Sequence, residues 1–419
     1  SRGLHWTYRG GTQLMFAWCK RTRRSSEDEI DVSKVKEAKP ASGQADSGST
    51  VQPDGEGPGL AEEGPKTEPL LPAETESATD DVEDDLKSLP KDVREVLQEA
   101  KRLQYEGYLF AAEEMVHKLL RRMEGSEELI EATMSTKACR QLVAGMQEVN
   151  SMLGTLLDDE GWTAQKEGDG IHVWTRPEQG SDLVTVRIAG VVEGPFDYFC
   201  SIGKEVQLVK SWMPGVRVSY IVKQLGVFDV VGYYAWKFPL ITGREFLLQE
   251  ANLINDSQGY CVVRRCPPIP QEGLELPDVA KHHIRATISN WCSFTAPVGR
   301  NDKGQNLIFV VTVMNLDMKI PLPSYLVNTL SVKMGYQSFQ QLRQNVKKAQ
   351  EPSNPLFKSV ADPTNIPYYS RMKGLESARE ANPVGCLREI METGWVKDPA
   401  ERRKIFARSD GVLVPMAAA

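Results

Sequence analysis

The spacing of the apolar residues changes near residue 161, and this change constrains the fold more than any other feature. In two stretches between residues 86 and 158, apolar side chains recur every three or four residues, which is the period of an amphipathic helix. After Gly161 and Trp162 they recur at every second residue, which is the period of a β-strand. The sequence therefore predicts helices followed by a sheet, in the α+β class.

Eight strands are predicted in the second part, and Gly, Pro, Asn or Asp separates them. Their order is interrupted by one helical segment, Pro195–Val209. Short sequential strands favour an antiparallel sheet, because parallel pairing requires a crossover helix at each step. The expected strands are Ile171–Thr175, Leu183–Val192, Val216–Leu225, Phe228–Phe238, Arg244–Ile254, Tyr260–Cys266, His282–Ala296 and Leu307–Met318.

A last helix is predicted after Pro323, with Ser324 as its N-cap. Its apolar stripe includes Leu326, Leu330 and Met334. A long antiparallel sheet and one amphipathic helix bury both apolar faces if the sheet curves around the helix. We therefore expect a curved sheet that encloses this helix, with extra helices on the N-terminal side.

Composition divides the chain into four regions. Residues 27–85 hold 18 Asp or Glu against 4 Lys, with almost no aromatic side chains, so residues 1–85 are predicted to be a disordered, acidic, low-complexity region. Residues 86–158 are expected to be helical and to pack on the domain that follows, at 159–350. Residues 351–419 are expected to form a C-terminal tail with short helices.

Four segments together resemble a known family. They are "WMPGV" (Trp212–Val216), "KFPLITGREF" (Lys237–Phe246), "HIRATI" (His283–Ile288) and "DMKIPLPSYLVN" (Asp317–Asn328). In this order, within roughly residues 162–346, they are similar to motifs of the START (steroidogenic acute regulatory protein-related lipid transfer) domain. The resemblance implies a helix-grip fold with an internal tunnel for a lipid.

Two charged residues, Arg244 and Glu245, open a strand that otherwise looks buried. The resembled family has an Arg-Asp pair here, so this chain keeps both charge signs with one extra methylene. Neighbouring strand residues point to opposite faces, so the two side chains are expected to have different partners. We expect them to anchor the turn rather than to contact a ligand directly.

The tunnel lining is predicted from strand alternation. Val218 and Tyr220 alternate with the polar Arg217 and Ser219, which points the even-numbered face inward. Ordinary core packing is the alternative for each aromatic residue. The predicted ligand-binding residues are Val218, Tyr220, Tyr234, Trp236, Arg244, Ile288, Cys292 and Phe294 on the strands, and Leu326, Leu330 and Met334 on the final helix.

Enzyme signatures are absent from the sequence. It contains no G-x-S-x-G, Walker A, G-x-G-x-x-G or H-E-x-x-H motif, so no catalytic residue and no cofactor are expected. His282 and His283 are adjacent on a predicted strand and point to opposite faces, so they do not form a metal site together. No basic stripe with interleaved aromatics indicates nucleic-acid binding.

The seven cysteines are scattered and form no C-x-x-C, which suits a reducing compartment such as the cytoplasm. The expected function is that of a noncatalytic module that holds a single lipid or sterol for transfer or sensing, with transient, peripheral membrane contact. A noncatalytic protein-interaction scaffold whose cavity is filled by its own side chains is the alternative.

Overall fold

The computed structural model describes residues 86–406, apart from 179, 181, 214, 228, 238–241, 256–258, 266–282 and 321–322. The chain forms two units, Ser1–Asp81 and Val82–Ala419, and the description below concerns the second. The region 1–85, predicted to be disordered, lies outside the described residues, as do the last residues of the predicted C-terminal tail. No helix in the described ranges is long and apolar enough to cross a membrane.

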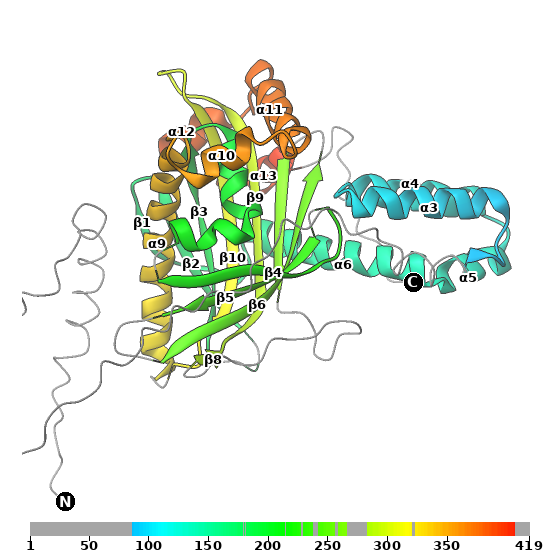
Figure 1. Cartoon of the computed structure of the whole chain (residues 1–419), viewed down its shortest axis with the longest axis horizontal. Coiled ribbons are helices and arrows are strands. Elements are labelled where there is room, and N and C mark those ends of the chain that lie inside the picture. Colours follow the sequence, from blue (N-terminus) through cyan, green and yellow to red (C-terminus); the bar gives the residue numbers. More distant parts are fainter. Residues whose placement is uncertain are drawn as a thin grey trace, which may run out of the picture. The chain divides into compact units, whose positions relative to one another are not determined.

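One sheet of ten strands forms the centre of the fold (Figure 1). The strand order is β1-β2-β3-β10-β9-β7-β6-β5-β4, with antiparallel neighbours throughout, and β8 pairs with β6 in parallel. The strands are β1 (Thr163–Gly168), β2 (Ile171–Pro177), β3 (Val184–Glu193), β4 (Val216–Gln224), β5 (Asp229–Trp236), β6 (Gly243–Asn255), β7 (Gly259–Arg265), β8 (His283–Arg285), β9 (Thr287–Arg300) and β10 (Asn306–Asp317). The α+β class and the antiparallel sheet are confirmed.

Along the chain, helices precede the first strand, interrupt the strands between β3 and β4, and follow the last strand. They are α3 (Lys91–Tyr105), α4 (Leu109–Arg122), α5 (Glu127–Ser135), α6 (Lys137–Leu157), α7 (Phe196–Lys204), α8 (Val209–Trp212), α9 (Ser324–Ala349), α10 (Pro355–Ala361), α11 (Ile366–Ala381), α12 (Leu387–Thr393) and α13 (Pro399–Phe406). A short 3-10 turn, η2 (Val206–Leu208), connects α7 to α8. The helical segment predicted between the second and third strands therefore consists of three short helical pieces, α7, η2 and α8.

The long helix α9 packs against β2, β3 and α7 (Figure 1). Tyr336 and Phe339 are its large buried residues, and Gly190 on β3 leaves room for the Phe339 ring. The predicted N-cap is wrong, because Pro323 occupies that position in an extended conformation and Ser324 is already helical. No side chain caps this end of α9.

Both faces of the sheet are covered. On the inner face, alternate residues of β3 and β10 form one hydrophobic cluster with α7, α9, α10 and α11. On the outer face, residues of β9 and β10 form another cluster with the helices α3 to α6 and with α12 and α13. Burial on both faces explains why β10 reads as an almost continuous apolar run.

Arg187 connects the outer face of β3 to both flanking regions. Its buried guanidinium lies 4.6 Å from the ring centres of both Trp162 and Trp174 and 5.1 Å from that of Trp395. It also pairs with Asp159 at 3.2 Å, and the same carboxylate accepts a hydrogen bond from Arg402 on α13. Burial lowers the pKa of Arg187 to about 10. This cluster joins the end of the N-terminal helices to the C-terminal helices.

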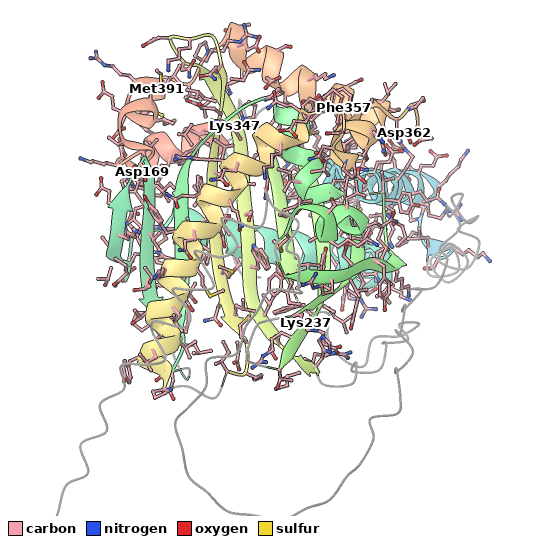
Figure 2. All side chains as sticks on the ribbon, turned by 60° about the vertical axis from the view of Figure 1, so that its left-hand side comes forward. Asp169, Lys237, Lys347, Phe357, Asp362 and Met391 are labelled. Atoms are coloured by element: carbon pink, nitrogen blue, oxygen red, sulfur yellow. The ribbon has the colours of Figure 1, made fainter. Side chains whose placement is uncertain are left out.

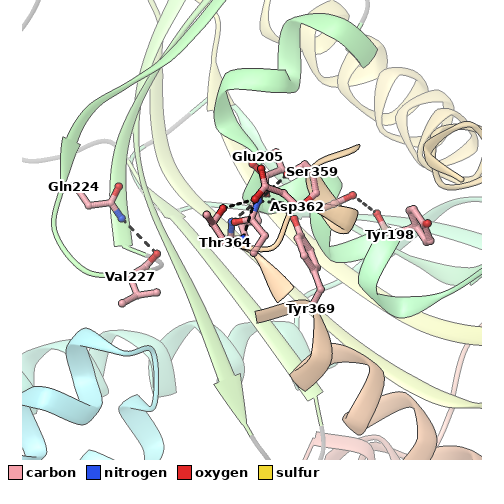
Figure 3. Close-up of polar contacts among 11 residues, drawn as sticks. Tyr198, Glu205, Gln224, Val227, Ser359, Asp362, Thr364 and Tyr369 are labelled. Carbon is pink, nitrogen blue, oxygen red and sulfur yellow. Dashed lines mark hydrogen bonds and ion pairs between the residues drawn. The ribbon is translucent and has the colours of Figure 1, made fainter. Parts of the chain in front are cut away.

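The helices that follow α9 are docked by polar contacts. Glu376 on α11 accepts a hydrogen bond from the backbone N–H of Phe196, the first residue of α7, at 2.8 Å. The buried hydroxyl of Tyr369 donates to Glu205 at 2.6 Å (Figure 3). The free N–H groups of a helix N-terminus attract a carboxylate, so Glu376 fixes α11 to the start of α7.

Candidate functional site

A small cavity lies on the inner face of the sheet and has a volume of about 30 Å³. Strands β5, β6, β9 and β10 form one side of it, and the α8 segment forms the other. Its lining residues are Val209, Trp212, Met213, Tyr234, Trp236, Phe246, Leu248, Trp291 and Leu316. Five of these nine residues are aromatic, so large, flat and mostly apolar side chains form the walls.

Alternation on β5 and β6 supplies the aromatic floor. Tyr234 and Trp236 are two residues apart on β5, as are Phe246 and Leu248 on β6, so all four point to one face. The rings of Trp236 and Phe246 meet edge to face with their centres 4.8 Å apart. That arrangement is one of the two preferred by aromatic pairs, and it fixes both rings.

The opposite wall is held in place by Ser219 on β4. Its hydroxyl accepts a hydrogen bond from the backbone N–H of Lys210 at 3.2 Å and donates one to the carbonyl of Gln207 at 3.3 Å. The α8 segment therefore sits against β4 although it is only one turn long. Trp212, its last residue, contacts both inner hydrophobic clusters.

None of the nine lining residues carries a formal charge. Arg244, on the same face of β6, is buried, and its guanidinium donates to the carbonyls of Met318, Thr242 and Lys319. Burial lowers the pKa of the Arg244 guanidinium. Arg244 therefore ties the start of β6 to the segment before α9, as an anchor at the rim of the sheet.

Four of the predicted strand residues lie on the inner face at this site. Tyr234 and Trp236 line the cavity, and Ile288 belongs to the same hydrophobic cluster. Arg244 lies on the same face, with its donors directed to backbone carbonyls.

The predicted face is wrong for Val218 and Tyr220. Both pack on the outer face with Tyr233, whose ring centre is 5.0 Å from that of Tyr220. The cause is an extra residue in β4: Val216 pairs with Trp236, but Val218 pairs with Ala235. Such a β-bulge reverses the direction of the side chains that follow it, here up to a second shift between Ile221 and Lys223.

The same error affects Cys292 and Phe294, which belong to the outer cluster with the N-terminal helices. The pairing of β9 with β10 shifts by one residue, since Asn315 pairs with Asn290 and Leu316 pairs with Ile288. Ile288 is therefore inside, and the next inward aromatic residue is Trp291.

Leu326, Leu330 and Met334 on α9 are half-buried, and none of them is a lining residue of the cavity. The cavity was expected against the final helix, but its second wall is α8. The reason is the position of α9, which packs on β2 and β3 rather than on β5 and β6.

The cavity is also lined by residues that the sequence did not predict: Trp212, Met213, Phe246, Leu248 and Leu316. Phe246 and Leu248 were detectable, because they continue the alternation that begins at Arg244. Trp212 belongs to the "WMPGV" motif but lies outside any strand, so strand alternation could not predict the direction of its side chain.

A larger groove of about 480 Å³ lies at the C-terminal end of α9. Figure 2 shows Asp169, Lys347 and Met391 around it. Arg343 also lines it, but three of its donors go to the carbonyls of Val191, Asp169 and Gly170. Charges of both signs surround this groove, so it is far less suited to an apolar ligand than the inner cavity.

The fold has been compared with known proteins. No family model matches the chain, and no curated protein matches its sequence significantly. Among solved structures, human STARD10 is 16% identical over 52% of this chain and 88% of its own, with a TM-score of 0.42. Human StAR-related lipid transfer protein 5 is 20% identical over 51% of this chain and 100% of its own, with a TM-score of 0.43. The STAR-related lipid transfer protein from Xanthomonas axonopodis is 20% identical over 45% of this chain and 99% of its own, with a TM-score of 0.36.

The chain's own architecture agrees with the helix-grip fold expected from the sequence. The antiparallel sheet, the α7–α8 interruption and the long helix α9 appear in the order expected of a helix-grip domain. Function has to be argued from the cavity.

Proposed function

We propose that the START-like domain binds one lipid or sterol molecule on the inner face of its sheet, without catalysing a reaction. The observation that carries the proposal is the aromatic, uncharged lining of the inner cavity, between β5, β6, β9, β10 and α8. Ligand sites of this kind are concave and mostly apolar, with few polar groups. Burial of apolar surface, at about 25 cal/mol per Å², is the driving force for binding.

The present volume of about 30 Å³ has room for one or two water molecules only. A lipid needs several hundred Å³, about 300 to 1,000 Å³ for ligand sites in general. Binding therefore requires that the walls separate, and α8 is the wall with the fewest residues. The first turns of α9, where Leu326 and Leu330 are half-buried, are the second element whose displacement we propose to widen the site. Transfer between membranes would bring this side of the domain into transient contact with a lipid surface, within a cytoplasmic setting.

Native mass spectrometry of the purified full chain tests the proposal. We expect an additional mass corresponding to one lipid per chain, which disappears when the protein is denatured. Delipidated protein should take up one molecule of a supplied lipid. A chain that carries no lipid and takes up none would favour the interaction scaffold with a filled core.

A further inference from the structure

The indole N–H of Trp212 is buried and finds no hydrogen-bond acceptor among the described residues. Trp212 ends α8 and forms part of the cavity wall. Buried polar groups are nearly always paired, and a donor left without a partner keeps the full cost of its lost hydration. An unpaired donor in the wall of a ligand cavity therefore has a direct interpretation: its acceptor arrives with the ligand.

The position of this donor is fixed before any ligand binds. Ser219 bonds to the backbone of Lys210 and Gln207 on either side of the start of α8. The backbone N–H of Met213 closes the turn by donating to Val209 at 2.8 Å. The Trp212 ring packs against residues of both inner clusters. A donor held this firmly loses little entropy when it meets an acceptor.

The chemistry of the walls limits what that acceptor is. The nine lining residues include no charged side chain, so the ligand group at this wall is uncharged too. An N–H group requires an acceptor, and the uncharged acceptors of lipids are hydroxyl and carbonyl oxygens.

We propose that Trp212 donates a hydrogen bond to a hydroxyl or carbonyl oxygen of the bound lipid, and so selects oxygen-bearing neutral lipid groups over plain hydrocarbon. This inference rests on the proposed lipid-binding function. A sterol hydroxyl and an acylglycerol ester carbonyl are the two sources of the same chemistry.

Trp212→Phe tests the inference, since it keeps an aromatic ring and removes the donor. Trp162→Phe is the matched control: its indole N–H is also buried without a partner among the described residues, but Trp162 packs on the outer face beside Arg187. Binding of cholesterol, dioleoylglycerol and the hydrocarbon cholestane, each supplied from cyclodextrin to delipidated full chain, would be titrated for the wild type and both variants.

For the oxygen-bearing lipid that the wild type binds, Trp212→Phe should weaken binding about threefold to tenfold. Cholestane should bind both proteins equally, and Trp162→Phe should bind every lipid like the wild type. A loss with cholesterol identifies a hydroxyl acceptor, and a loss with dioleoylglycerol alone identifies an oxygen of its glycerol ester part. Equal binding by Trp212→Phe and the wild type overturns the inference while leaving lipid binding intact. A wild type that binds none of the three overturns the proposed function itself.

A second measurement does not depend on the variant retaining its fold. The indole N–H signals of the eight tryptophans can be followed by NMR in the wild-type chain as lipid is added. The Trp212 signal should move downfield, as expected for a newly formed hydrogen bond, and the Trp162 signal should stay. An unmoved Trp212 signal at saturating lipid contradicts the inference.

Discussion

Arg285 holds Glu245 through two hydrogen bonds to one carboxylate oxygen, Oε1, from Nε at 2.9 Å and Nη2 at 2.7 Å. The second oxygen of the fully buried Glu245 accepts a hydrogen bond from Tyr233 at 2.9 Å. Burial and this hydrogen bond raise the pKa of the Tyr233 phenol. Arg244, the preceding residue, points to the opposite face and binds backbone carbonyls. The two adjacent charges therefore anchor the same strand from its two sides.

We expect Glu245→Gln to destabilise the folded chain by about 1 to 3 kcal/mol, because Arg285 loses its charged partner. The expected loss of stability is smaller than for a fully buried ion pair, because the Arg285 side chain is 23% exposed. The check is a urea melt. Glu392→Gln removes a carboxylate from an exposed pair with Arg388 and should leave the melt unchanged. Equal midpoints for the two variants would contradict the anchoring role.

The opposite faces of this charged pair were predictable from the sequence, whereas the faces of Val218, Tyr220, Cys292 and Phe294 were not. Periodicity alone located most of the strands and the final helix, because one or both faces of each is buried. Strand β1 was missed because Thr163, Ala164 and the residues up to Glu167 are exposed, so no alternation marks it.

The inner and outer faces were confused where a strand contains an extra residue. A bulge beside Val218 and another beside Ile288 change the phase of alternation, and neither leaves a trace in the composition of its strand. The Arg187 cluster could not be predicted from the sequence either, because Asp159, Trp395 and Arg402 come together from distant parts of the chain. Only the tertiary fold creates such contacts.

Arg187→Met should cost about 1 to 3 kcal/mol of folding free energy, because it removes a buried charge that contacts three tryptophan rings and pairs with Asp159, whose side chain is 43% exposed and keeps Arg402 as a partner. Arg176→Met is the control, since Arg176 also lies over Trp162, at 4.8 Å, but its ion-pair partner among the described residues is Glu178, near the surface. It should cost less than about 1 kcal/mol. Denaturant melts of both variants give the comparison, and a small loss for Arg187→Met would show that the cluster does not join the flanking regions to the sheet.

Gly394→Ala should be strongly destabilising, by about 2 kcal/mol or more. Gly394 ends α12 with φ of 75°, and a Cβ there would clash with the carbonyl group of Gly170, in the turn before β2. Gly374→Ala, in α11 with nothing within 4 Å of the added Cβ, should instead stabilise by about 0.5 to 1 kcal/mol. Thermal melts that shift in opposite directions confirm the tight contact between α12 and the sheet, and parallel shifts contradict it.

Glu376 should make stability depend on pH. Burial is the main cause that raises the pKa of this carboxyl, followed among the raising causes by the nearby Asp197. An acid whose pKa is raised by folding stabilises fully below its unfolded pKa of about 4.5, and this contribution is lost as pH rises through the folded value.

Glu376→Gln stays neutral at every pH and keeps an acceptor for the Phe196 N–H. The variant should therefore be more stable than the wild type at pH 7 to 8, and the difference should shrink towards pH 4.5. Urea melts across this range measure it. A difference that does not change with pH would show that the ionised carboxylate is tolerated at the start of α7.

The placement of the ligand is best tested by two neighbouring leucines on β6. Leu248 lines the inner cavity, while Leu247 packs in the outer cluster with Tyr233, and both are almost fully buried. Replacing either by Trp adds similar bulk to a packed site and should cost about 1 to 3 kcal/mol of stability. Because only the inner side chain meets the ligand, Leu248→Trp should weaken lipid binding, whereas Leu247→Trp should leave it within twofold of the wild type. Titration of both variants with the copurified lipid, alongside a melt, makes the comparison; a greater loss of binding for Leu247→Trp would place the ligand on the outer face.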